Sequence, residues 1–307
     1  MAKHSKSIYS ALAANLLIAA SKFIAGAFTN SSSMISEGIH SVVDTTNQLL
    51  LLYGLKRAAK PADKLHPFGY GRELYFWSFM VSIFIFCLGG GVSIYQGILH
   101  IKEPELSGDP TLNYVVLGLS LIFEGTSFII ALKEFNAVRG KQNTLWQAFV
   151  KSKDPSGFLV LFEDGAAVLG LLIVTFFMIL SHALNLPYLD GVASVFVGLL
   201  LVSVSVVLGR ECRSLLMGEG IGPGTQAKIQ QIAQEDASVN QVLHIHSIYQ
   251  SPEEIVLILT VAFNSNQDIH EINDAVVRLR ENIKKEIPLV AFVIVQPQDI
   301  SLPQILP

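Results

Sequence analysis

The sequence "SSSMISEGIHSVVDTTNQLLLLYGL", residues 31–55, decides the fold class of this chain. It is long enough to cross a lipid bilayer as one helix, since a membrane helix needs about 20 mostly apolar residues. Three ionisable side chains interrupt its apolar character: Glu37, His40 and Asp44. Residues three or four apart share one face of a helix, so these side chains belong to one face. Such a face inside a membrane indicates a path for ions or protons.

The whole chain has the composition of a membrane protein. Of its 307 residues, 51% are hydrophobic and 15% are charged, whereas soluble domains usually contain about 25% charged residues. Lysine and arginine gather in the connections after the second, fourth and sixth apolar segments, which by the positive-inside rule places both termini in the cytoplasm. Six segments reach the length of a membrane span, at about 8–28, 33–55, 74–99, 112–133, 157–182 and 188–209.

The chain changes character near Gly218, where its hydropathy falls to that of a soluble protein. The spacing of apolar residues then predicts a helix, two strands, a helix and a strand, over about 80 residues. We therefore expect a six-helix transmembrane domain at 1–215 and a small cytoplasmic α+β domain at 216–307. So small a domain is marginal alone, and we expect a homodimer. A short interfacial helix is expected at about 145–150.

The fifth apolar segment contains the sequence "LVLFEDGAAVLG", residues 159–170. His40 and Asp44, four residues apart, supply half of a tetrahedral site for a divalent metal. Small residues after Asp164 allow a neighbouring helix to approach closely. Asp164 is thus the candidate third ligand, and Glu163 is either the fourth ligand or a proton carrier.

Other polar residues in the apolar segments have two interpretations each. Glu124 is either a proton relay or a partner in helix packing. Lys22 either balances the acids or extends its amine to the membrane surface. Glu37 is assigned to the surroundings of the metal or to the proton path.

Two further metal sites are candidates outside the membrane. In the loop "PADKLHPFGYGRE", Asp63 and His66 form either a peripheral metal site or a polar turn. In the C-terminal domain, His244 and His270 are either metal ligands or ordinary surface histidines.

Three motifs together resemble the cation diffusion facilitator family. They are "SSSMISEGIHSVVD", "HPFGYGRELYFWSF" and "SKDPSGFLVLFEDGAAVLG", and the resemblance is nearest to the branch of the animal mitochondrial zinc transporter. It implies six spans, a cytoplasmic α-β-β-α-β domain, a homodimer, and efflux of a divalent metal, most often zinc, by alternating access and exchange for protons. Transport-site ligands at His40, Asp44 and Asp164 are implied by the same motifs.

The chain departs from the family pattern at three places. Val160 stands where many members have a second ligand in the fifth helix, usually histidine, four residues before the aspartate. Tyr70 stands where some have another histidine in the loop, and Val295-Gln296-Pro297 replaces a late His-x-Asp. Fewer nitrogen ligands weaken the preference for zinc over manganese or iron. A two-metal cytoplasmic site is not expected.

The sequence thus predicts a Zn²⁺ efflux transporter in a bacterial inner membrane, with lipid, protons and a second copy as partners. No prosthetic group or nucleic-acid partner is expected. Enzymatic activity is not expected either, and the H-E-x-x-H motif that a membrane metalloprotease would need is absent. The alternatives are a Mn²⁺ or Fe²⁺ exporter of the same family and a membrane metal sensor that does not transport.

Overall fold

The computed structural model describes residues 2–104, 111–138, 144, 147–149 and 152–299, with side chains from Asn15 onward. The expected interfacial helix therefore lies largely outside the described residues. Contacts divide the chain into two compact units. One comprises Met1–Lys56 and Leu74–Arg213, and the other comprises Arg57–Glu73 and Ser214–Pro307.

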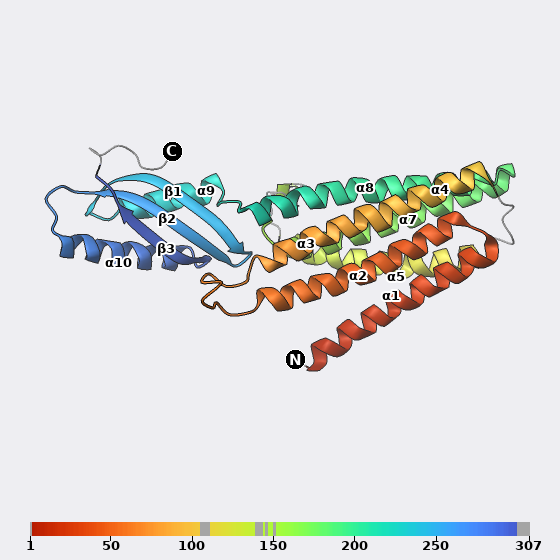
Figure 1. Cartoon of the computed structure of the whole chain (residues 1–307), viewed down its shortest axis with the longest axis horizontal. Helices are drawn as coiled ribbons and strands as arrows, with labels where there is room; N and C mark the ends of the chain where they lie inside the picture. Colours follow the sequence, from red (N-terminus) through yellow and green to blue (C-terminus); the bar gives the residue numbers. More distant parts are fainter. Residues whose placement is uncertain (1, 105–110, 139–143, 145–146, 150–151, 300–307) are drawn as a thin grey trace. The chain divides into compact units, whose positions relative to one another are not determined.

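The first unit is a bundle of long helices (Figure 1). A seven-residue π-helical segment, η1, joins α3 to α4, so that these elements form one continuous helical stretch. The helices are α1 (Ala2–Thr29), α2 (Ser32–Ala58), α3 (Glu73–Phe84), η1 (Ile85–Gly91), α4 (Val92–Lys102), α5 (Thr111–Val138), α7 (Pro155–Leu184) and α8 (Tyr188–Met217).

Four helical stretches in the described part of the chain are long and apolar enough to cross a membrane. They are Glu73–Lys102, Thr111–Ala137, Pro155–Leu184 and Tyr188–Met217. The described apolar part of α1, Asn15–Thr29, is shorter. Helix α2 contains polar residues such as Ser36, Glu37 and Asn47, which lower its hydropathy. These side chains are buried inside the bundle. Four of the six predicted spans are therefore supported, and the first two stay a prediction.

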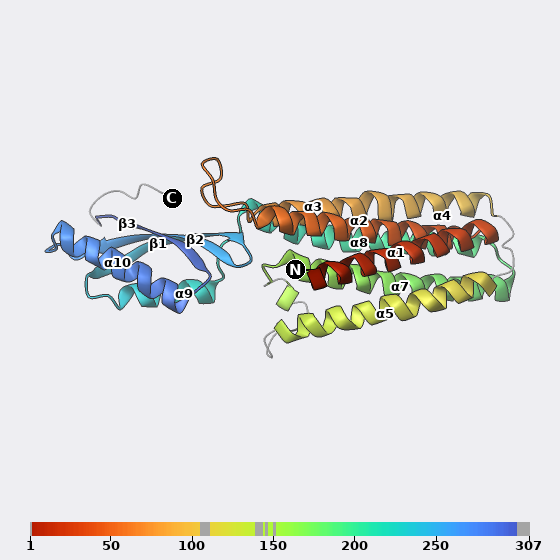
Figure 2. The same ribbon diagram turned by 90° about the horizontal axis from the view of Figure 1, so that it is seen from below.

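Close helix packing holds the bundle together. Helix α5 contacts both α1 and α7, and Figure 2 shows α5 and α7 side by side. Helices α4 and α8 meet at glycines: a Cβ atom added to Gly97 would lie 2.6 Å from the Gly191 carbonyl oxygen. Only glycine permits so close an approach of two backbones.

The second unit contains the predicted order of helix, strand, strand, helix and strand. Its elements are α9 (Pro223–Gln234), β1 (Val239–Ser251), β2 (Glu254–Phe263), α10 (Ile269–Glu286) and β3 (Val290–Pro297). The sheet order is β1-β2-β3, with β1 antiparallel and β3 parallel to the central strand. A parallel pair needs a crossover connection, and α10 supplies it. Helix α10 buries Ala275, Leu279 and Ile283, spaced four residues apart.

The loop between α2 and α3 belongs to this second unit. Phe68 packs edge-on against Phe292 of β3, with ring centroids 5.3 Å apart. A Cβ atom added to Gly71 would lie 2.6 Å from the Gln250 carbonyl oxygen of β1. The Arg72 guanidinium donates a hydrogen bond to the Leu216 carbonyl oxygen at 2.9 Å. The loop is thus packed onto the last turn of α8 and onto the sheet.

Candidate functional site

A hollow of about 220 Å³ lies inside the helix bundle and is lined by four of its helices. It brings together Asp44 of α2 and Asp164 of α7, the two carboxylates that the sequence predicts to be metal ligands. The full lining is Asn15 and Ile18 of α1, Ser41, Asp44 and Gln48 of α2, Phe123, Glu124 and Ser127 of α5, and Asp164 and Ala167 of α7.

The two aspartates differ in their hydrogen bonds. Ser127 donates its hydroxyl to Asp164 Oδ2 at 2.7 Å, which fixes that carboxylate against α5. Asp44 Oδ1 is buried and has no hydrogen-bond partner among the described residues. His40 Nδ1 lies 3.4 Å from this oxygen.

His40 is buried in α2 with unused hydrogen-bonding capacity. Its side chain is 2% exposed, and neither ring nitrogen has a hydrogen-bond partner within the described part of the chain. Buried polar groups in folded proteins almost always have such a partner. The unused nitrogens of His40 and the unused oxygen of Asp44 are therefore suited to a bound cation.

Glu163, the predicted fourth ligand, has a different contact. Asn47 donates its side-chain amide to Glu163 Oε1 at 2.7 Å, and Glu163 does not line the hollow. No three histidine, cysteine, aspartate or glutamate side chains converge on one metal position in the residues that the structure describes. The predicted ligands would have to lie closer together than they do here to hold one ion between them.

Lys22 balances the acids, which was one of its two interpretations. Its side chain is 0% exposed, so its amine does not extend to the membrane surface. The Nζ atom donates to Glu37 Oε2 at 3.0 Å, to Ser41 Oγ at 2.9 Å and to Glu124 Oε1 at 2.7 Å. An ammonium group has three donors, and all three are used here.

Glu37 lies between α1 and α7. A Cβ atom added to Gly170 of α7 would lie 2.8 Å from Glu37 Oε1, so the glycine leaves the space that this carboxylate occupies. Glu124 links the same lysine to the hollow that contains Asp44 and Asp164. The sequence contains one signal that α5 contributes to this site. Glu124 and Ser127 are three residues apart and therefore share one helix face.

A second polar cluster surrounds Asp190 at the start of α8. Its carboxylate accepts from the Ser31 hydroxyl at 2.8 Å, from the Ser33 backbone N–H at 3.1 Å and from the Ser33 hydroxyl. His100 Nε2 lies 3.8 Å away. Asp190 thus caps the first turn of α2, where backbone N–H groups lack helical partners, and ties α2 to α8.

The contacts of the loop pair Asp63 and His66 build a turn. Asp63 Oδ1 accepts from the backbone N–H groups of Leu65 at 2.9 Å and His66 at 2.7 Å, and Oδ2 accepts from the Tyr70 hydroxyl at 2.7 Å. The Tyr70 hydrogen bond is the main reason that the pKa of Asp63 falls to about 2. The same bond raises the pKa of Tyr70. The metal site predicted here stays a prediction.

The predicted cytoplasmic pair lies on two different elements. His244 is on β1, and its ring stacks on His246 with centroids 5.9 Å apart. His270 is in the first turn of α10, where its backbone N–H donates to Asp268 at 2.8 Å. A shared metal between His244 and His270 also stays a prediction.

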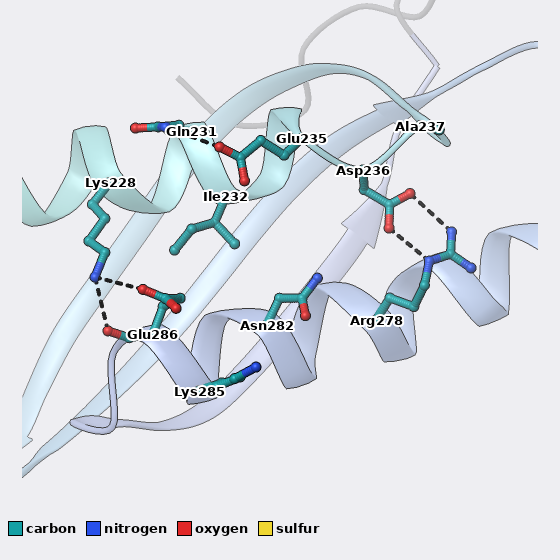
Figure 3. Close-up of a pocket in the computed structure, with 10 residues that line it drawn as sticks. All are labelled: Lys228, Gln231, Ile232, Glu235, Asp236, Ala237, Arg278, Asn282, Lys285 and Glu286. Carbon is teal, nitrogen blue, oxygen red and sulfur yellow. Dashed lines mark hydrogen bonds and ion pairs between the residues drawn. The ribbon is translucent and has the colours of Figure 1, made fainter.

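A larger hollow, of about 760 Å³, lies between α9 and α10 (Figure 3). Its charged groups are largely paired with one another. Lys228 Nζ lies 3.1 Å from Glu286 Oε2, and Arg278 Nε lies 2.9 Å from Asp236 Oδ2. Hydrogen bonding to Arg278 lowers the pKa of Asp236 and raises the pKa of Arg278. The first pair joins the two helices and the second joins α10 to the turn after α9, and we assign no ligand to this hollow.

Comparison with known proteins identifies the family of the membrane unit. The model of the cation efflux transmembrane domain matches residues 8–217. The mouse mitochondrial proton-coupled zinc antiporter SLC30A9 is 34% identical over 222 residues, which are 72% of this chain and 39% of that protein. Metal tolerance protein C4 of Arabidopsis thaliana is 31% identical over 254 residues, 82% of this chain and 54% of that protein.

More distant relatives match more of their own length. The magnetosome protein MamM of Magnetospirillum gryphiswaldense is 23% identical over 86% of this chain and 80% of its own. A nickel form of the MamM C-terminal domain is similar to 25% of this chain and 96% of that domain, with 13% identity and a TM-score of 0.24. The chain spans about two fifths of the length of the animal zinc antiporters that it matches.

Proposed function

Because the chain belongs to the cation efflux family, the cation diffusion facilitators, we propose that it exports a divalent metal cation in exchange for protons, with Zn²⁺ as its main cargo. One observation carries the proposal. Asp44 and Asp164, from two different helices, line one hollow inside the bundle, next to an unpartnered His40. Zinc is the cargo named for the animal relatives of 34% identity.

The proposal includes an arrangement in the membrane. Helices α1 and α2 complete a set of six spans, residues 1–215 form the transport domain, and residues 216–307 form a cytoplasmic domain. Both termini face the cytoplasm, as the lysine and arginine distribution favours. We expect a homodimer in a bacterial inner membrane, although the animal relatives are mitochondrial.

The transport cycle follows from the chemistry of the ligands. Neutral His40 and ionised Asp44 and Asp164 bind the cargo, with Glu163 as the fourth candidate. Metal ligands must be deprotonated, so protons that reach the same groups on the far side compete with the metal and release it. Histidine, with an ordinary pKa near 6.5, suits such an exchange. Glu37 and Glu124 are candidates for the proton path.

Two alternatives make different predictions. A set rich in carboxylate oxygens also suits Mn²⁺ and Fe²⁺, which would make the chain an exporter of those metals. A membrane metal sensor would bind zinc without moving it or protons. No enzymatic activity, prosthetic group or nucleic-acid partner is proposed.

Proteoliposomes test the proposal directly. Purified full-length protein is reconstituted with an acidic lumen, and entry of Zn²⁺, Mn²⁺ and Fe²⁺ is followed with and without the proton gradient. We expect zinc entry that the gradient accelerates and that Asp164→Asn abolishes. Zinc binding without entry would indicate the sensor, and failure to move any of the three metals would contradict the proposed function.

A further inference from the structure

Glu124 of α5 lies in the same hollow as the two predicted aspartate ligands. It comes from a helix to which the sequence assigns no metal ligand. Ser127, on the next turn of α5, holds Asp164 by a 2.7 Å hydrogen bond. The same face of α5 therefore positions one ligand and also presents a carboxylate of its own.

The two oxygens of Glu124 have different surroundings. Oε1 accepts from Lys22 Nζ at 2.7 Å. Oε2 is buried and has no hydrogen-bond partner in the part of the chain that the structure describes. A buried carboxylate oxygen without a donor is costly unless something positive binds it. Glu124 thus has one oxygen fixed and one available.

Lys22 cannot pair with every acidic side chain in this region. Its single positive charge is shared between Glu37 and Glu124, and its third donor is used by Ser41. No donor of Lys22 remains for Asp44 or Asp164. The hollow therefore contains more acidic side chains than Lys22 can pair with, and a divalent cation would supply the missing positive partner.

An independent observation points to a ligand beside Asp44, which lines the same hollow. His40 is 2% exposed, and both of its ring nitrogens lack hydrogen-bond partners among the described residues. Its Nδ1 atom lies 3.4 Å from Asp44 Oδ1. Unused nitrogens beside Asp44, together with unused oxygens on Asp44 and Glu124, are the complement that a metal cation requires.

We propose that Glu124 contacts the transported cation through Oε2, and that Lys22 is the positioning residue that holds its other oxygen. This inference rests on the proposed function and adds a third helix, α5, to the cargo site. It also gives the site three carboxylates and one imidazole. Such a set accepts Mn²⁺ and Fe²⁺ more readily than a site of several histidines.

The test measures metal binding to the full-length protein in detergent by calorimetry, with zinc chloride as the titrant. Glu124→Gln keeps the shape of the side chain and removes its charge. We expect zinc affinity to fall by about tenfold or more. Glu134→Gln, which removes the same charge from an exposed position on the same helix, is the matched control and should bind zinc like the wild type.

A second variant separates contact with the cation from a structural role. Glu124→Cys replaces a hard oxygen by a soft sulfur, so binding should shift toward Cd²⁺ and away from Mn²⁺. Lys22→Gln should weaken binding of both metals without changing their ratio, because Lys22 does not touch the cation. An unchanged cadmium-to-manganese ratio in Glu124→Cys would overturn the inference.

Asp164→Asn distinguishes failure of the inference from failure of the proposed function. If Asp164→Asn loses zinc binding while Glu124→Gln retains it, the inference is overturned and the proposed function stands. If the wild type binds no zinc, the proposed function itself is wrong. Thermal melting confirms folding of each variant. Should Glu124→Gln not fold, Glu124→Ala takes its place, and wild-type zinc affinity in that variant would overturn the inference.

Discussion

The chain contains two acid–histidine pairs with the same interatomic distance, one in α2 and one in the loop after it. In both pairs a histidine Nδ1 lies 3.4 Å from an aspartate Oδ1. His40 and Asp44 have side chains 2% and 18% exposed, whereas His66 and Asp63 are 49% and 48% exposed. The separation of the two groups therefore does not distinguish a candidate cargo site from a turn.

The hydrogen bonds around each pair do distinguish them. Asp63 accepts three hydrogen bonds from its own loop. Asp44 Oδ1 and both nitrogens of His40 accept or donate none among the described residues. Unused capacity in a buried group costs free energy, and a bound cation, as proposed for this site, would offset that cost. A satisfied exposed pair needs no such explanation.

The largest expected effect comes from removing the buried aspartate. Asp44→Asn keeps the shape of the side chain but removes an anionic ligand, so zinc entry into proteoliposomes should fall by about a hundredfold or more. Asp63→Asn in the loop should leave the rate within about twofold, since the comparison assigns Asp63 to a turn. A tenfold loss in Asp63→Asn would instead support the predicted loop metal site.

The histidines should differ in the same direction, with a smaller effect. His40→Ala removes the nitrogen ligand, so zinc affinity measured by calorimetry should fall by about tenfold or more, and preference should shift toward Mn²⁺. His66→Ala should change neither quantity. Equal zinc affinity in His40→Ala and the wild type would remove His40 from the ligand set.

Substitutions at two glycines extend the comparison of the bundle and the loop to the stability of the fold. Gly170 is beside Glu37, and an added Cβ would lie 2.8 Å from Oε1, so Gly170→Ala should destabilise the bundle by about 1–3 kcal/mol. Gly69, in the loop, has open space around it but a φ of +83°. Gly69→Ala should therefore cost about 1–2 kcal/mol through backbone strain alone.

Thermal melting of both variants measures these losses. Gly125→Ala on α5 is the control, because nothing lies within 4 Å of an added Cβ. Replacing a helical glycine by alanine without crowding should stabilise the protein by about 0.5–1 kcal/mol. A stabilising Gly170→Ala would show that Glu37 does not lie against α7.

The smallest effect concerns the pH dependence of the loop. The pKa of Asp63 is lowered from 3.8 to about 2 in the folded chain. A depressed folded-state pKa contributes stability that is present above the unfolded value and lost as pH falls through the folded one. The loop should therefore loosen between about pH 4 and pH 2.

Tyr70→Phe removes the strongest cause of that shift. The pKa of Asp63 should move back toward its ordinary value, and the acid loosening should begin at a higher pH. Carbon-13 NMR of labelled aspartate, assigned with Asp63→Asn, measures this pKa. An unchanged value would show that the Tyr70 hydroxyl does not bond to Asp63.

The sequence predicts features that lie within one element better than features that join elements. The spacing of Ala275, Leu279 and Ile283 predicts the amphipathic helix α10, and the α-β-β-α-β order follows from periodicity. The shared face of His40 and Asp44 follows from helical geometry. In each case the pattern is contained in a single stretch.

Contacts between helices that are far apart in the sequence cannot be predicted from such patterns. Lys22 and Glu124 are 102 positions apart, and nothing in either segment shows which face of α1 meets which face of α5. The length of an apolar segment shows that it can cross the membrane, but it does not show which neighbouring helix it packs against. The hydrogen bond from Asn47 to Glu163 and the role of Ser127 were missed for the same reason.

The packing of the loop between α2 and α3 onto the sheet of the second unit has a consequence for protein synthesis. Phe68 and Gly71 leave the ribosome before α5, α7 and α8 are made, yet their partners Phe292 and Gln250 lie in β3 and β1. Contacts between residues distant in sequence form late. The loop therefore lacks these contacts until β1 and β3 have been synthesised and the sheet has formed. A chain that stops before β3 would leave Phe68 without Phe292, which makes this contact a marker that β3 has been made.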